Sequence, residues 1–160
     1  MGNIILTASN AHAHREFDQM EWFGTRIEYA LVAAMHLARY SRSDDPVKLD
    51  HIVAQTGAPP KYLVHILLKL KEKALVNSKR GPSGGYWLVK PARMTSVAEI
   101  VSAVETESEA PREPSVKDEE AGQAIKEVWL QLEKKRWKAM KNISLEDLLQ
   151  RTEPEEETRS

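Results

Sequence analysis

Cysteine is absent from this chain of 160 residues. Its absence excludes disulfide bonds and thiolate-ligated sites, including the common iron–sulfur clusters and cysteine-type zinc sites, so we expect no cofactor. Aromatic residues are also few, with two Phe and four Tyr, which predicts a mainly aliphatic core. No apolar run approaches the roughly 18 to 20 residues that span a bilayer, and the N-terminus lacks the layout of a secretory signal. We therefore expect a soluble cytoplasmic protein that makes no membrane contact.

Several motifs typical of enzymes are missing as well. The run GPSGG lacks the lysine of a GxxxxGK phosphate loop, no GxGxxG follows an expected strand, and no HExxH occurs. His36, His51 and His65 are spread over different expected helices, where solvated or packing roles are commoner than catalysis. His12 and His14 form an HxH pair without a third ligand. The sequence therefore predicts neither catalytic residues nor a metal site.

The first part of the chain predicts two helices after a flexible extension. Residues 1–19 show no sustained period, and Met20 is an alternative start. A first helix is expected over residues 25–40, since its apolar side chains recur at helical spacing. They are Ile27, Ala30, Leu31, Ala34, Leu37 and Ala38. A shorter helix follows with Leu49, Ile52 and Val53 inward, and Gly57 suits its left-handed cap.

The stretch from residue 57 to residue 93 predicts a third helix that leads into a hairpin. Pro60 suits the first turn of this helix, where its missing amide costs nothing. The apolar stripe of the helix comprises Leu63, Ile66, Leu67, Leu70, Ala74 and Leu75. Residues 75–79 and 86–89 have strand composition, and Gly84 and Gly85 in the intervening turn tolerate positive φ. Two helices joined by a glycine-containing turn and followed by a hairpin outline a winged helix-turn-helix.

Charge within this stretch is one-sided. Residues 57–93 contain eight Lys or Arg and one acid, Glu72, although the whole chain has a net charge of −1. Lys61, His65 and Lys69 lie four residues apart, which places three potential hydrogen-bond donors in a row on the third helix. A basic helix beside a basic hairpin is the charge pattern expected of a DNA-binding protein. The alternative for any single lysine is an ordinary solvated surface position.

The last third of the chain predicts three more helices. Ser96 and Glu99 have the spacing of a capping box, and so have Ser144 and Asp147 before a short closing helix. Between them, a long helix is expected over residues 117–141. Its apolar stripe is interpreted as a dimer contact, the alternative being that it folds back on its own domain. The residues predicted to form the dimer contact are Ile125, Val128, Trp129, Leu132 and Met140.

The expected fold class is mostly α with a small β-hairpin wing, namely a winged helix-turn-helix with a long C-terminal dimerisation helix. The organisation has five parts. They are a flexible extension (1–19), a winged helix-turn-helix DNA-binding domain (20–105), an acidic loop (106–116), the dimerisation and closing helices (117–150) and an acidic tail (151–160).

A family resemblance rests on RGPSGGYWLVKP, on KYLVHILLKL before it and on TSVAEIVSAVE after it. With these motifs and the first-helix pattern RIEYALVAAMHLA, the sequence resembles bacterial transcription regulators of the Rrf-two type, the group of IscR, NsrR and CymR. The resemblance covers about residues 20–105. It implies a homodimer that is held together by the long C-terminal helix and binds imperfect palindromes in double-stranded DNA. We expect such a regulator to act as a repressor.

The resemblance also implies roles for single residues. By position, Lys61, Val64 and His65 face bases, and Arg80 enters the minor groove. Val64 departs from the polar residue often found there. Because a valine can contact a thymine methyl group but cannot accept a hydrogen bond from cytosine, known operator preferences do not transfer. The residues predicted to bind DNA are Pro60, Lys61, Tyr62, Val64, His65, Lys69, Lys79, Arg80, Gly81, Pro82 and Ser83.

A second departure concerns the cofactor of the family. Its cluster-binding members carry three cysteines in and after the loop that reads TESEAPREPSVKDEEAG here, and this chain has none. The sequence therefore resembles a cysteine-free member without an iron–sulfur cluster. It leaves open whether a small molecule, a partner protein or neither is the effector. The alternative function is a winged-helix interaction module that binds acidic protein and does not read DNA.

Overall fold

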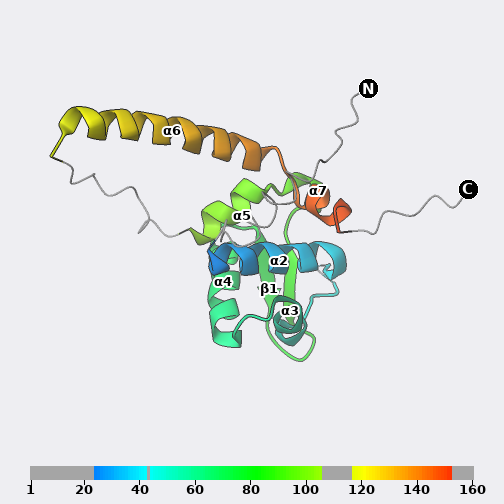
Figure 1. Ribbon diagram of the computed structural model, residues 1–160. Coiled ribbons are helices and arrows are strands. Elements are labelled where there is room, and N and C mark those ends of the chain that lie inside the picture. Colours follow the sequence, from blue (N-terminus) through cyan, green and yellow to red (C-terminus); the bar gives the residue numbers. More distant parts are fainter. Residues whose placement is uncertain (1–23, 43, 106–116, 153–160) are drawn as a thin grey trace, which may run out of the picture.

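The computed structural model describes residues 24–42, 44–105 and 117–152 (Figure 1). The expected extension (1–19) with its HxH pair, the acidic loop (106–116) and all but two residues of the acidic tail lie outside the described residues. The described part is mostly helical and carries one two-stranded antiparallel hairpin, so the predicted fold class is confirmed. No helix within these ranges combines the length and apolar composition needed to cross a bilayer.

The secondary structure follows the predicted order. The helices are α2 (Thr25–Tyr40), α3 (Leu49–Thr56), α4 (Pro60–Glu72), α5 (Val97–Val104), α6 (Glu119–Lys141) and α7 (Leu145–Gln150). The strands are β1 (Val76–Lys79) and β2 (Gly85–Leu88), and a short 3-10 helix, η1 (Ala92–Met94), precedes α5. Val76 pairs with Leu88 at one end of the hairpin, and Lys79 pairs with Gly85 at the other.

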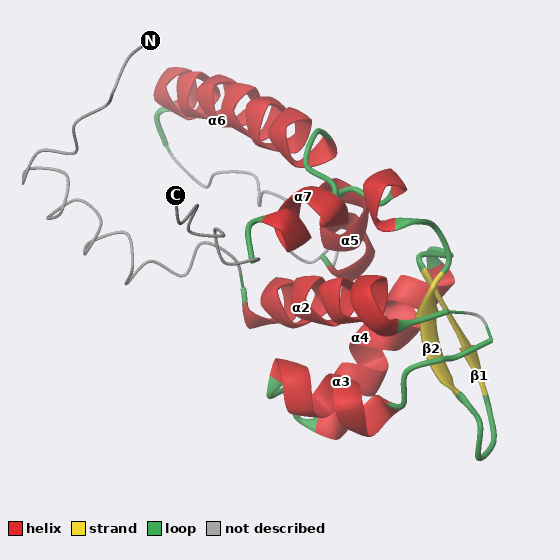
Figure 2. Ribbon diagram, turned by 90° about the vertical axis from the view of Figure 1, so that its right-hand side faces the viewer, coloured by secondary structure: helices red, strands yellow, loops and turns green. Residues whose placement is uncertain are grey.

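Helix α2 is the centre of the packed body. It contacts α3, α4, α5, α7 and β2 (Figure 2). Ala30, Ala33 and Ala34 are fully buried on its inner face, and such small side chains let neighbouring helices approach closely. The core is otherwise aliphatic, as predicted, with Leu37, Ile52, Leu63 and Leu70 among its fully buried members. Burial of apolar surface of this kind is the main stabilising contribution to folding.

The turn between α3 and α4 has the expected geometry. Gly57 ends α3 in the left-handed conformation (φ 68°), and its amide donates to the Val53 carbonyl over 2.8 Å. Pro60 lies in the first turn of α4, where its missing amide leaves no helical hydrogen bond unmade. The sequence therefore located both ends of this turn correctly.

Helix α4 ends earlier than its apolar pattern suggested. The helix stops at Glu72, and Ala74 adopts a positive φ of 54°, the only such non-glycine residue among those described. The Leu75 amide donates to the Leu70 carbonyl over 3.0 Å, which closes the helix end as in a Schellman motif. Ala74 is consequently exposed rather than part of the buried stripe, whereas Leu75 is buried.

Gly84 and Gly85 of the hairpin both lie where the backbone leaves no room for a side chain. Gly85 has a positive φ of 159°, as predicted. Gly84 does not have a positive φ, whereas Gly81 in the same turn has a φ of 108°. At Gly84 the obstacle is space, because a Cβ there would lie 2.2 Å from the Lys79 carbonyl oxygen. A Cβ at Gly85 would lie 2.4 Å from the Val47 carbonyl oxygen. Close backbone approach therefore fixes glycine at both positions.

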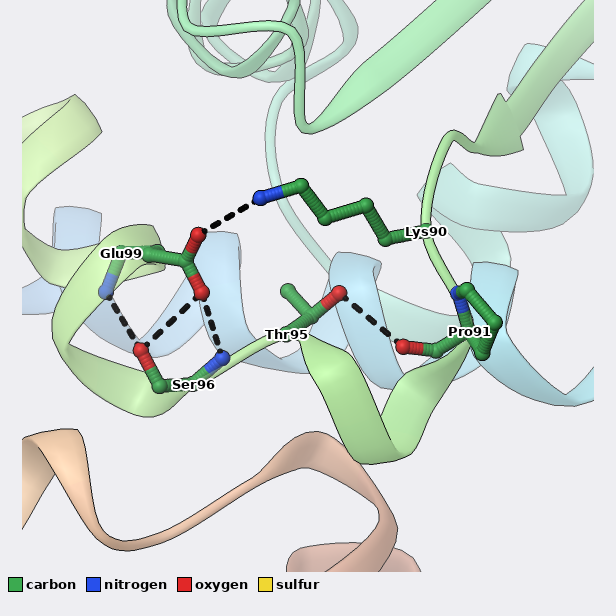
Figure 3. Close-up of polar contacts among 5 residues, drawn as sticks. All are labelled: Lys90, Pro91, Thr95, Ser96 and Glu99. Carbon is green, nitrogen blue, oxygen red and sulfur yellow. Dashed lines mark hydrogen bonds and ion pairs between the residues drawn. The ribbon is translucent and has the colours of Figure 1, made fainter.

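Both predicted capping boxes are present. At the start of α5 the Ser96 hydroxyl accepts from the Glu99 amide, and the Glu99 carboxylate accepts from the Ser96 amide over 2.8 Å (Figure 3). The Lys90 ammonium group donates to the same carboxylate over 3.0 Å, which ties the segment after β2 to α5. Ser144 and Asp147 form the second box at the start of α7. These contacts fix the hairpin and the C-terminal helices on the body.

The ionised form of Glu99 stabilises this arrangement. Burial opposes ionisation, but the hydrogen bonds from Ser96 and Lys90 outweigh it and hold the pKa of Glu99 below its ordinary value. A carboxyl group whose pKa is lowered on folding adds stability above its unfolded pKa, and this contribution is lost as the pH falls through the folded pKa. Glu99→Gln should therefore destabilise the protein at pH 7, and its difference from wild type should shrink below about pH 4.

Denaturant unfolding of both proteins across this pH range measures the effect. Ser96→Ala, which leaves the carboxylate but removes the capping hydroxyl, should cost about 1 kcal/mol at pH 7. If Glu99→Gln lowers the free energy of unfolding equally at pH 7 and at pH 3, ionisation of Glu99 does not stabilise the turn.

Candidate nucleic-acid interface

A groove of about 550 Å³ runs between α4 and the hairpin, with the start of α3 at one wall. Four of the residues that line it are cations, and none of its described lining residues is acidic. The lining comprises Lys48, Leu49, Val64, Leu67, Leu68, Lys71, Ser78, Lys79, Arg80, Gly81, Pro82, Gly84, Gly85 and Tyr86. A cationic groove beside an exposed helix is suited to a polyanion.

The hairpin is held beside α4 by contacts from the chain before α3. Val47 and Tyr86 exchange two backbone hydrogen bonds, of 2.9 Å and 2.8 Å, so residue 47 pairs with the outer edge of β2. The Ser41 hydroxyl accepts from the Leu88 amide over 3.1 Å and donates to the Leu37 carbonyl over 2.6 Å. The wing is therefore anchored to the end of α2 as well as to its own strand partner.

Only some of the residues predicted to bind DNA lie together in the groove. Val64 and four hairpin residues line it, namely Lys79, Arg80, Gly81 and Pro82. Pro60, Lys61, His65 and Ser83 are exposed on the same two elements, outside the lining of the groove. The structure thus brings the α4 face and the hairpin tip side by side.

Tyr62 faces the body of the protein. It is half-buried, and its hydroxyl accepts a hydrogen bond from Arg26 Nε on α2 over 3.3 Å. Its ring packs edge-on against Tyr29, with 6.1 Å between ring centroids. Since these contacts give Tyr62 a packing role between α4 and α2, we leave it out of the proposed DNA surface.

Two lysines of α4 differ in their surroundings. Lys69 pairs with Glu72 one turn later over 3.2 Å, and both side chains are largely exposed, so this pair adds little stability. Lys71 donates to the Ser78 hydroxyl of β1 over 2.7 Å and so lies at the junction of helix and hairpin. The partner of Lys69 reduces its local positive charge, whereas Lys71 adds to the charge of the groove.

Sequence reasoning missed Lys48, Leu49, Leu68 and Lys71 as members of the groove. For two of them a signal existed, because Val64, Leu68 and Lys71 follow at i, i+4 and i+7 and therefore share one helical face. No local pattern marks Lys48 and Leu49, which reach the groove through the packing of α3 against α4.

The run GPSGG also matches the GxSxG pattern of serine hydrolases. In those enzymes the serine lies on a sharp turn between a strand and a helix. Here the run connects two antiparallel strands, and Ser83 is exposed at the tip of the hairpin. The match is therefore fortuitous, and Ser83 is not placed as a nucleophile.

Helix α6 projects from the body over most of its length (Figure 1). The predicted contact residues Ile125, Val128, Trp129 and Leu132 are 61%, 57%, 58% and 50% exposed. Met140 differs, because it is only 5% exposed and belongs to the chain's own core. The exposed stripe therefore consists of the first four residues.

The base of α6 is fixed by an ion-pair cluster. Arg136 pairs with Glu105 at the end of α5 over 3.5 Å and with Glu133 over 2.9 Å. Together with the burial of Met140, these contacts hold the last turns of α6 on the body.

The fold and the groove define a winged helix-turn-helix protein with an extended C-terminal helix. The profile of Rrf2, described as an iron-dependent transcriptional regulator family, matches residues 23–151. Since this match covers most of the sequence, the chain belongs to the Rrf2 family of transcriptional regulators.

Individual relatives agree with this assignment. IscR of Xenorhabdus nematophila, an HTH-type transcriptional regulator, is 32% identical over 127 residues, which cover 78% of this chain and 77% of that protein. A Rhodobacter capsulatus protein named rrf2-like is 39% identical over 82 residues, or 50% of this chain. The match spans about half the length of that protein and of two Mycobacterium tuberculosis relatives, 55%, 49% and 49% respectively.

Solved structures share the fold. CymR, the global cysteine regulator of B. subtilis, superposes with a TM-score of 0.65 at 26% identity, covering 84% of this chain and all of that one. The relatives are transcriptional regulators rather than enzymes, which fits the expectation of no catalytic activity.

The iron dependence in the family description does not fit the donor set of this chain. Iron–sulfur clusters are held by cysteine thiolates, and the sequence contains none. Within the described residues, no three His, Asp or Glu side chains are grouped closely enough to hold a metal ion. No step of the function is therefore assigned to iron.

Proposed function

We propose that this protein binds double-stranded DNA in a sequence-specific manner through α4 and the hairpin and thereby regulates transcription. The observation that carries the proposal is the groove between these elements, whose described lining residues include four cations and no acid. Positive side chains that neutralise DNA phosphates release bound counterions, which supplies much of the binding free energy. In this proposal, the exposed α4 residues beside the groove reach base edges.

The two elements have separate tasks in this proposal. Helix α4 enters the major groove, where Lys61, Val64 and His65 face bases. Arg80, at the tip of the hairpin, enters the neighbouring minor groove, whose negative potential attracts arginine. Lys48, Lys71 and Lys79 contact phosphates and set the register of the protein on the duplex.

The proposed regulator is a homodimer on a palindromic operator. Residues 20–105 form the DNA-binding part, and residues 117–150 form the dimerisation part, in which the exposed stripe of α6 meets the same stripe of a second copy. Two recognition helices related by a twofold axis bind half-sites about one helical turn apart.

We expect this regulator to act in the bacterial cytoplasm as a repressor, because a dimer bound at a promoter excludes other proteins from the same DNA. It functions without an iron–sulfur cluster.

Selection of bound genomic fragments tests the proposal. The full-length protein should enrich a limited set of fragments that share a palindromic motif, and the neighbouring genes would name the regulated pathway. A protein-interaction module, the competing function, would show no preference among duplexes at equal salt concentration. Enrichment that follows fragment length alone would contradict the proposal.

Replacement of Arg80 tests the role of the hairpin. Arg80→Ala should weaken operator binding by about 1 to 3 kcal/mol, measured by fluorescence anisotropy, because a minor-groove cation is lost. Arg93→Ala is the matched control, since Arg93 is also exposed but lies in η1, outside the groove. Unchanged affinity of Arg80→Ala, or an equal loss in both variants, would refute the assignment of the hairpin.

A further inference from the structure

The groove contains two exposed apolar side chains among its cations. Val64 is 41% exposed and Leu68 is 49% exposed, and both line the groove from α4. They lie one helical turn apart, at i and i+4, so their side chains are neighbours on the helix surface. We call Val64 and Leu68 the apolar ridge. Its position indicates that a bound partner covers apolar as well as charged surface here.

The charges around the ridge restrict the partner. Lys71, one turn beyond Leu68, donates to Ser78 on β1, and Lys79 and Arg80 form the opposite wall of the groove. A partner seated on the ridge is thus surrounded by positive charge, so its outer groups must be anionic. Duplex DNA fits both requirements, because phosphates border a major groove that also carries methyl groups.

Thymine supplies those methyl groups. Its C5-methyl is the apolar feature that base pairs present in the major groove, and aliphatic side chains bind it by contact alone. Neither Val64 nor Leu68 can donate or accept a hydrogen bond, so the ridge cannot distinguish bases by polar groups. We propose that the apolar ridge reads thymine methyl groups in each operator half-site, an inference that rests on the proposed function.

The spacing of the ridge matches this ligand. Four residues of α-helix advance about 6 Å, and two base-pair steps advance about 6.8 Å. We therefore expect each half-site to present two thymines within about two base-pair steps of each other, one for each side chain. Burial of one methyl group contributes about fourfold to affinity.

Deoxyuridine measures this contribution directly, because it pairs as thymine does and lacks only the C5-methyl group. The full-length protein is titrated with operator duplexes, identified by fragment selection, in which each thymine is replaced by deoxyuridine in turn. Wild type should lose about fourfold in affinity at two thymines of each half-site. The loss at one of them should disappear in Val64→Ala, and the loss at the other in Leu68→Ala.

Lys73→Ala is the control, since Lys73 is exposed at the end of the same helix but outside the lining of the groove. This variant should keep the wild-type ratio of the affinities for thymine and deoxyuridine duplexes, whatever its overall affinity. Because Val64 and Leu68 are exposed, their truncation leaves the core intact, and unchanged thermal unfolding verifies this.

The outcomes separate the two proposals. Failure to select any sequence from the genome, or binding of acidic protein in place of duplexes, overturns the proposed function and the inference with it. Two other outcomes overturn only the inference. In the first, the protein selects a specific sequence but deoxyuridine does not change its affinity. In the second, deoxyuridine lowers the affinity equally in wild type and in both ridge variants.

Discussion

Trp129→Asp should convert the proposed dimer into a monomer and weaken operator binding by about 10²- to 10⁴-fold. Trp129 is 58% exposed on the stripe that α6 presents away from the body. A carboxylate at this position would have to lose its hydration in an apolar contact between two copies, which is costly without a partner charge. Loss of the dimer removes the second recognition helix, so each half-site is then bound independently.

Sedimentation of the variant and titration of the operator test both parts of this expectation. Gln131→Asp is the matched control, because it introduces the same carboxylate at an exposed position on another face of α6. That control should remain dimeric and bind the operator as wild type does. A dimer that survives Trp129→Asp would place the subunit contact elsewhere.

Operator affinity should fall by about 10³- to 10⁵-fold between 50 and 200 mM salt. The groove of each subunit carries Lys48, Lys71, Lys79 and Arg80, so a dimer offers twice this set to DNA phosphates. A complex with roughly six to ten phosphate contacts releases a comparable number of counterions, and its affinity depends steeply on salt concentration. The slope of the logarithm of affinity against the logarithm of salt concentration measures this number.

Variants of single lysines locate the contributing charges. Lys71→Gln should reduce the slope by about two for the dimer, since each subunit loses one phosphate contact. Lys134→Gln, on exposed α6, should leave the slope unchanged. Affinity that does not respond to salt, or equal changes in both variants, would contradict the assignment of the groove as the phosphate-binding surface.

Helix boundaries and caps could be predicted because they depend on neighbours in the sequence. Gly57, Pro60, Ser96 and Ser144 each act through backbone groups only a few residues away, and all four lie where their residue types predicted. The end of α4 was missed because Ala74 is apolar and fits the helical period. Its left-handed conformation is set by how the chain turns into β1.

The candidate site was predictable to a lesser extent. Val64, Lys79 and Arg80 line one groove together, as do Lys48 and Lys71, which no local pattern had marked, whereas Tyr62 packs against α2. Which side of α4 remains exposed depends on α2, because α2 covers the side that carries Tyr62. Met140 likewise fits the stripe of α6 but is buried where α6 joins the body.

By itself, the sequence determined the order of the helices, the position of the hairpin, the excess of positive charge and the absence of thiolate ligands. These properties follow from residue type and short-range spacing. Only the tertiary structure decided which cations face one another across the groove and which stripe of α6 stays uncovered. Both depend on how each helix is rotated about its own axis, and this rotation is fixed by packing between residues that are distant along the chain.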